Sequence, residues 1–95
     1  MQKTYRVEFS KFAEKQIERL RESIGVAVTI WTKAVEFKGL PEVRKSKSYH
    51  DEPLKGSRHG QRSIRLNRAY RLIYEESEQN EIVVVGVKEV NKHEY

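Results

Sequence analysis

One apolar run near the C-terminus constrains the fold of this 95-residue chain more than any other feature: IVVVGV, residues 82–87. Successive side chains of a strand point to opposite faces of a sheet, so a run that is apolar at every position predicts a strand covered on both sides. A chain of this length buries one modest core. We therefore expect a single domain, residues 1–95, built around a central strand.

Apolar periodicity predicts one strand and two helices at the start of the chain. Residues 4–9 alternate between apolar and polar side chains, as in a half-buried strand, and Ser10 is suited to cap the following helix. A first helix is predicted by one apolar stripe, which consists of Ala13, Ile17, Leu20 and Ile24. Gly25 is expected to end or bend this helix. A second stripe predicts a helix closed by Gly39 and Pro41: Ala27, Ile30, Trp31, Ala34 and Val35.

Two more strands are predicted after a polar loop at residues 40–60. Residues 63–67 and 70–75 alternate, with a turn at 67–69 between them and another at 76–80 before the central strand. This element order predicts an α+β fold. We expect an N-terminal strand and a two-helix hairpin packed on one face of a small antiparallel β-sheet, whose other face is at least partly open.

Positive charge is concentrated in one third of the chain. Between Pro41 and Arg71 nine basic residues accompany three acidic ones, a net charge of +6, whereas the other 64 residues carry ten basic and eleven acidic ones. A local basic region is typical of nucleic-acid binding. A solvated basic surface or an acidic protein partner would also explain it, so charge alone leaves the ligand open.

Two arginines are predicted to project from the open face of the sheet. If Ile64 and Leu72 face the helices, strand alternation directs Arg65 and Arg71 to the opposite face, close to their shared turn. Two guanidinium groups so placed can bind one phosphate through their planar forks, although a surface ion pair would explain either arginine alone. The same region supplies further basic candidates for RNA contact: Lys45, Lys47, Lys55, Arg58, Arg62 and Arg68.

The C-terminus adds groups suited to proton transfer and stacking. His93 follows the central strand and titrates near neutral pH, and Tyr95 is suited to stack on a base. From position alone, a frayed terminus with an exposed histidine and tyrosine is the better explanation. The chain has no cysteine and no motif of a phosphate loop, serine hydrolase or zinc protease. An enzyme built on Arg, Lys, His and Tyr suits transesterification of RNA by its own 2′-hydroxyl, without metal or cofactor.

Residues 53–74 resemble the RelE/ParE superfamily of toxins from bacterial toxin–antitoxin pairs, and within it the HigB- and RelE-like ribonucleases. The matching motifs are Pro-Leu-Lys-Gly at 53–56 with Arg58 and Gly60, Ser-Ile-Arg at 63–65, and Tyr-Arg-Leu-Ile-Tyr at 70–74. The family order of strand, helical hairpin and antiparallel strands agrees with the elements predicted over the whole chain. Over residues 1–50 only this architecture agrees.

The resemblance implies a type II toxin that inhibits translation as an mRNA endoribonuclease, by cutting the codon in the ribosomal A site. Arg71 resembles the arginine that binds the scissile phosphate. Lys55 matches the lysine of the Pro-Leu-Lys-Gly segment, and Arg65 matches a basic position of the hairpin. His93 is placed like a catalytic histidine of the family, and Tyr95 like a terminal aromatic residue that stacks on the codon.

The pattern departs from the family at two points, and two other functions accompany the fold. Ser63 stands where RelE-type members have a basic residue, and the glutamate base of some members has no clear equivalent. The ParE branch poisons DNA gyrase, and a non-catalytic RNA-binding relative is the other alternative. Arg71 together with His93 favours the ribonuclease.

The expected partners are a cognate antitoxin, the small ribosomal subunit and mRNA, with no membrane. The resemblance implies an acidic, partly disordered antitoxin that wraps the helices and covers the basic face. The chain contains no run of 18 apolar residues and no cysteine, so we expect a cytoplasmic protein.

Overall fold

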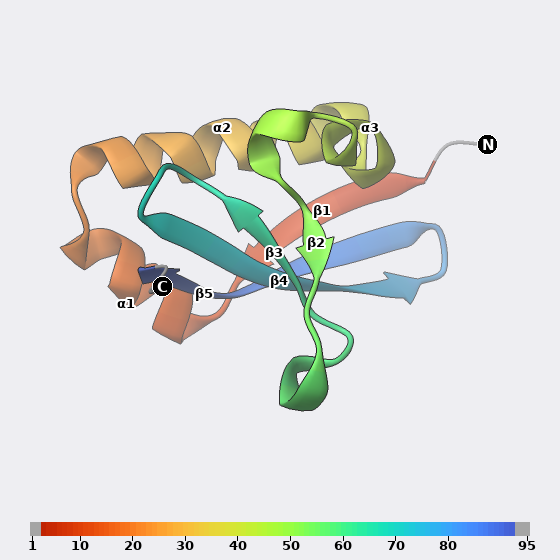
Figure 1. Cartoon of the computed structure of the whole chain (residues 1–95). Helices are drawn as coiled ribbons and strands as arrows, with labels where there is room; N and C mark the ends of the chain where they lie inside the picture. The colour runs from red at the N-terminus through yellow and green to blue at the C-terminus, as the bar shows by residue number, and fades with distance from the viewer. Residues whose placement is uncertain (1–2, 93–95) are drawn as a thin grey trace.

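The computed structural model describes residues 3–92, which form three helices and a five-stranded sheet (Figure 1). The strands are β1 (Thr4–Phe9), β2 (Glu52–Pro53), β3 (Arg62–Arg65), β4 (Tyr70–Gln79) and β5 (Ile82–Lys92). The helices are α1 (Lys11–Arg19), α2 (Glu22–Lys38) and α3 (Leu40–Arg44), with 3-10 turns η1 (Lys47–Tyr49) and η2 (Gly56–Arg58). The predicted α+β class is confirmed, and no helix in the described part is long and apolar enough to cross a membrane.

The sheet is mixed rather than antiparallel as predicted. The strand order is β1-β5-β4-β3-β2, in which β1 pairs parallel to β5 and the other pairs are antiparallel. The parallel pair arises because β1 lies beside β5, the last strand of the chain, and not beside the strand that follows it in the sequence. The position of β5 between β1 and β4 confirms the prediction of a central strand. Cover on both faces is not complete: Val83, Val85 and Val87 are buried on one face, whereas Ile82, Val84 and Gly86 on the other are only partly buried.

The helices begin and end at other residues than predicted. The first helix ends at Arg19, so Gly25 lies inside α2 instead of closing α1. The buried stripe of α2 is Ile24, Val28, Trp31 and Val35, whereas the side chain of Ile30 is 58% exposed. The predicted N-cap is correct, because the Ser10 hydroxyl accepts a hydrogen bond of 3.0 Å from the Ala13 amide.

The expected polar loop contains short elements that the sequence pattern did not indicate. Gly39 separates α2 from α3 with φ of 89°, and an added Cβ would lie 3.1 Å from the Tyr5 ring. A larger residue would therefore meet both backbone strain and a steric clash there. After α3 the chain passes η1, forms β2 at the edge of the sheet, and continues through η2, which extends beyond the strands on the side away from α2 (Figure 1).

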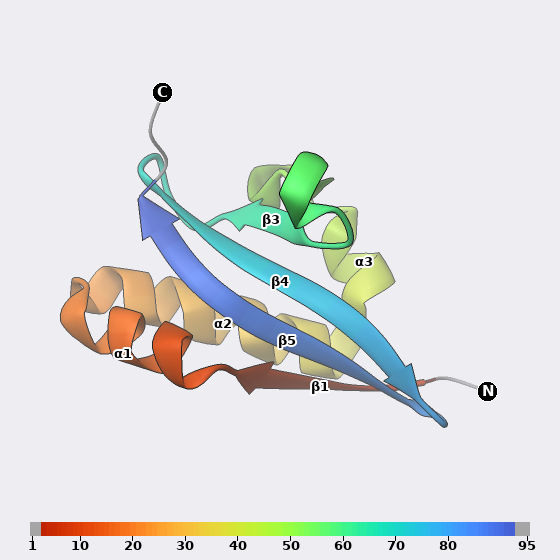
Figure 2. The ribbon, with the colours of Figure 1, turned by 90° about the horizontal axis from the view of Figure 1, so that it is seen from below.

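The core lies between α2 and the sheet. Figure 2 shows β4 and β5 in front of α2, so this helix covers the far face of both strands. The rings of Trp31 and Tyr74 lie at its centre, with centroids 5.4 Å apart, and neither residue is accessible to solvent. The opposite face of the sheet is the one on which the predicted arginines project.

Candidate functional site

The strand register places Arg65 and Arg71 opposite one another on the face of the sheet away from α2. Ile64 pairs with Leu72 in the ladder between β3 and β4, and both side chains are fully buried in the core. Arg65 pairs with Arg71 one position further along, so alternation turns both arginines to the other face. The pair of guanidinium-bearing positions predicted from the sequence is therefore present.

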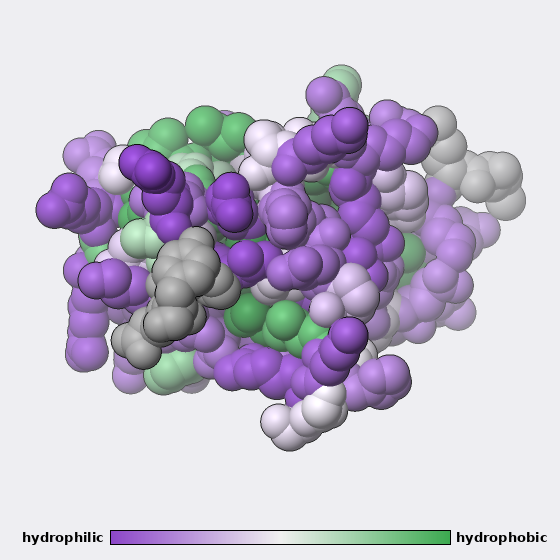
Figure 3. Space-filling model, viewed as in Figure 1, coloured by the Kyte–Doolittle hydropathy of each residue, from purple (hydrophilic) through white to green (hydrophobic). Residues whose placement is uncertain are grey.

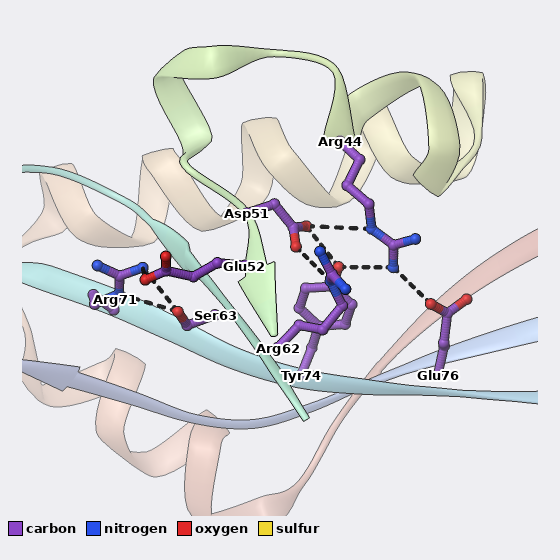
Figure 4. A network of polar contacts seen from close by, with 8 residues as sticks. All are labelled: Arg44, Asp51, Glu52, Arg62, Ser63, Arg71, Tyr74 and Glu76. Carbon is purple, nitrogen blue, oxygen red and sulfur yellow. Dashed lines mark hydrogen bonds and ion pairs between the residues drawn. The ribbon is translucent and has the colours of Figure 1, made fainter. Parts of the chain in front are cut away.

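Arg71 is held in place by a hydroxyl and a carboxylate (Figure 4). Its Nη2 donates to Ser63 Oγ at 2.8 Å and to Glu52 Oε1 at 3.1 Å, and its Nε donates to Ser63 Oγ at 3.2 Å. The Arg71 side chain is 12% exposed, whereas that of Glu52 is 49% exposed. Ser63, which is buried, therefore orients the guanidinium group from the side of the sheet. Glu52 neutralises it from the solvent side, and this half-exposed carboxylate is free to move away.

A β-bulge supplies a second ion pair beside the first. The register of β4 and β5 shifts between Ile73, which pairs with Glu89, and Tyr74, which pairs with Val87. The extra residue of β5 allows Val87 and Val90 both to be buried while Glu89 faces the open side. Glu89 forms an ion pair with Arg58 of η2 and accepts a hydrogen bond from the Asn91 amide. This contact connects the η2 segment to the sheet.

These groups surround a pocket of about 250 Å³ between the η2 segment and the sheet. The pocket combines apolar side chains with two arginines and a carboxylate. It is lined by Glu52, Leu54, Arg58, Ser63, Arg71, Ile73, Asn91 and Lys92. The surface around it is mostly hydrophilic, with a small apolar patch (Figure 3). Cations beside a flat apolar patch suit a ligand that has both a phosphate and a base.

A second polar network fixes the segment that carries Glu52 (Figure 4). The Asp51 carboxylate is 2% exposed and accepts hydrogen bonds of 2.6 Å from both Arg62 Nε and the Tyr74 hydroxyl. Arg44 donates to the same hydroxyl at 3.1 Å and to Glu76 at 2.6 Å. Burial and the hydrogen bond to Asp51 raise the pKa of Tyr74 well above its usual value, although Arg44 opposes this.

Removing the Tyr74 hydroxyl is expected to destabilise the fold. We expect Tyr74→Phe to lower the free energy of unfolding by about 2 kcal/mol at neutral pH, because Asp51 loses a buried donor. The raised pKa keeps the folded tyrosine protonated, while the unfolded one ionises above about pH 10. The free energy of unfolding of the wild type therefore falls above that pH, and the difference in this free energy between the wild type and Tyr74→Phe becomes smaller. Urea denaturation at neutral and alkaline pH measures both effects. In Tyr5→Phe, whose hydroxyl has no partner within residues 3–92, the curves should match wild type.

The other predicted basic residues fall into two groups. Lys45 and Arg62 form ion pairs with Glu42 and Asp51, as Arg58 and Arg71 do with their glutamates. Among residues 3–92, no ion pair is formed by Lys47, Lys55, Arg65 or Arg68. His93 and Tyr95 lie outside the described residues. Much of the predicted positive charge is therefore compensated.

Sequence analysis missed two carboxylates of this site, Glu52 and Glu89. Glu52 directly precedes the Pro-Leu-Lys-Gly motif, but the two-residue strand that turns it toward Arg71 has no periodicity to detect. Glu89 lies beyond the predicted end of the central strand, and the bulge that directs it to Arg58 is not visible in the sequence.

Comparison with known proteins gives the fold. No protein-family model matches the chain, and no curated protein matches its sequence. The solved structure of YafQ from Escherichia coli has a TM-score of 0.74 at 16% identity, over 95% of this chain and 94% of YafQ. The YoeB/ParE toxin from Agrobacterium tumefaciens gives 0.73 at 16% identity, over 94% and 99%. A chain of the RelBE2 toxin–antitoxin complex from Mycobacterium tuberculosis gives 0.62 at 24% identity, over 95% and 99%.

The chain has the RelE-like toxin fold. These likenesses extend over more than nine tenths of each chain. The resemblance inferred from residues 53–74 is thereby confirmed for the fold. Because a fold hosts more than one activity, the function of this RelE-like chain has to be argued from its pocket.

Proposed function

We propose that this chain is the toxin of a type II toxin–antitoxin pair and that it cuts mRNA in the ribosomal A site. The observation on which this rests is the position of Arg71 opposite Arg65, with the Glu52 carboxylate in contact with Arg71. Two guanidinium groups bind and stabilise a phosphorane, and a carboxylate beside them accepts a proton. The fold and the compensated basic surface are compatible with this function but do not require it.

The proposed reaction is transesterification at the RNA phosphodiester. The scissile phosphate takes the place of Glu52 on the Arg71 fork, which is possible because Glu52 is half exposed. The freed carboxylate accepts the proton of the 2′-hydroxyl, whose oxygen attacks phosphorus. The bond from phosphorus to the 5′-oxygen breaks, and the leaving oxygen takes a proton from Lys55 or His93. The products are a 2′,3′-cyclic phosphate and a 5′-hydroxyl.

A cognate antitoxin is the proposed protein partner. The matched structures include the toxin–antitoxin complexes RelBE2 and DinJ–YafQ. An acidic segment would compete with RNA for cations that form no ion pair within residues 3–92, such as Lys55 and Arg65. We propose that it covers the pocket at Arg71 and so blocks access of mRNA.

The test is primer extension on a defined mRNA incubated with the purified chain, with and without ribosomes. We expect cuts at codon positions only in the presence of ribosomes. Glu52→Gln should cut about 100-fold more slowly, because the amide has the same shape but cannot accept the proton. Equal cutting by Glu52→Gln would exclude this carboxylate as the base. Intact mRNA together with DNA breaks in arrested cells would replace the ribonuclease by a gyrase poison.

A further inference from the structure

Cations that form no ion pair within the described part of the chain gather at the end of the sheet where β3 turns into β4. Arg65 and Arg68 belong to this turn, Lys92 ends β5, and Arg21 lies between α1 and α2. None of these four forms an ion pair with another residue of the range 3–92. Figure 1 shows the turn, the connection between α1 and α2, and the end of β5 on the same side of the molecule.

Two of these cations line a pocket of about 300 Å³. Arg21 contributes from the helix connection and Lys92 from β5, and Ser23, Asn67 and Tyr70 complete its polar lining. Asn67 Oδ1 accepts the amide hydrogens of Ala69 and Tyr70 at 2.8 Å, which leaves its amide nitrogen free to donate. Among the described residues no carboxylate lines this pocket. A concave site with two cations, an amide donor and two hydroxyl groups suits an anion.

This pocket shares one lining residue with the candidate catalytic pocket. Lys92 lines both of them. In the ladder between β4 and β5, Tyr70 pairs with Lys92 and the next residue, Arg71, pairs with Asn91. Neighbouring positions along a strand face opposite sides of the sheet, so the two pockets open on opposite faces and meet at the end of β5, where Lys92 lies. They differ in charge balance, because the arginines of the first are paired with carboxylates and the cations of the second are not.

We propose that the pocket formed by Arg21, Lys92 and Asn67 binds a second phosphate of the RNA strand whose scissile phosphate lies at Arg71. The identity of the ligand rests on the proposed function, and the anion site itself rests on the charges and the shape. A phosphate fits better than an acidic peptide, because a pocket of about 300 Å³ admits one small anionic group but not the extended surface of a protein partner. The second contact fixes the path of the strand across the end of the sheet and sets which phosphodiester meets Arg71.

The experiment measures binding of a fluorescent single-stranded 2′-O-methyl oligouridine, which cannot be cleaved, over a series of salt concentrations. Arg21→Gln and Lys92→Gln keep the aliphatic stem and remove the charge. A plot of the logarithm of the association constant against the logarithm of the salt concentration should become less steep by about 0.7 in each variant, as for one lost phosphate contact. Binding at roughly 0.1 M salt should weaken about fivefold in each variant. The control Lys33→Gln removes an exposed charge from the outer surface of α2 and should leave slope and affinity unchanged.

Two results would overturn the inference. In one, Arg21→Gln and Lys92→Gln bind the oligonucleotide as Lys33→Gln does. In the other, both variants keep RNA affinity but lose affinity for polyglutamate, which assigns the pocket to an acidic protein instead. The outcome is independent of the proposed ribonuclease. A chain that binds RNA through Arg21 and Lys92 but cuts nothing supports this site while it removes the catalytic proposal.

Discussion

Replacing Arg71 by alanine should reduce ribosome-dependent mRNA cleavage by roughly 10³-fold, the cost of losing a cation that stabilises charge in a phosphoryl transition state. The contacts of this side chain fix its guanidinium group at the pocket. Ser63 orients the guanidinium from below, and Arg65 projects from the paired position of the adjacent strand. Primer extension at a fixed ribosome concentration measures the rate, and thermal melting shows that the variant is folded.

Two matched variants show whether the loss comes from the phosphate site. Arg71→Lys keeps the positive charge but loses the planar fork, so it should recover only part of the rate. Arg6→Ala removes an exposed arginine from β1 and should cut like wild type. Cleavage by Arg71→Ala at more than about a tenth of the wild-type rate would contradict the assignment, since one lost transition-state contact costs more than that.

The local part of this site was predictable from the sequence. Alternation along a strand depends only on neighbours in the chain, so the orientation of Arg65 and Arg71 followed once Ile64 and Leu72 were assigned to the core. The first strand was predicted with its observed bounds, whereas the last two strands were predicted too short. β4 continues to Gln79, but its last residues are polar and exposed on both faces, so they show no alternation of apolar and polar side chains.

The partners of the arginines were not predictable, because they come from distant parts of the chain. Asp51, Glu52 and Glu89 meet Arg62, Arg71 and Arg58 only after β2 has joined the sheet and the bulge has shifted the register of β5. A count of charge along the sequence therefore overestimates the free positive charge near the site. The end of the first helix was predicted wrongly for another reason. Ile24 belongs to the buried stripe of α2, and because it was assigned to the first helix, Gly25 resembled a helix end.

Asp51→Ala should be the most destabilising single change in this region, lowering the free energy of unfolding by about 3 kcal/mol. The carboxylate is nearly inaccessible and is the acceptor for Arg62 and Tyr74, so its loss leaves the buried Tyr74 hydroxyl hydrogen without an acceptor and the Arg62 cation without its ion pair. The cost stays at the low end for a broken buried pair because Arg62 is 27% exposed and can reach water. Urea denaturation followed by circular dichroism measures the change.

The same substitution should also reduce cleavage, because residues 51 and 52 belong to one short extended segment and point to opposite sides of it. Asp51 anchors the segment to the core, and this anchor holds Glu52 against Arg71. Glu42→Ala provides the control: its ion pair with Lys45 lies entirely at the surface, so stability and cleavage should both stay at wild-type values. If Asp51→Ala unfolded at the same urea concentration as Glu42→Ala, the buried network would not hold the segment, and the position of Glu52 beside Arg71 would need another cause.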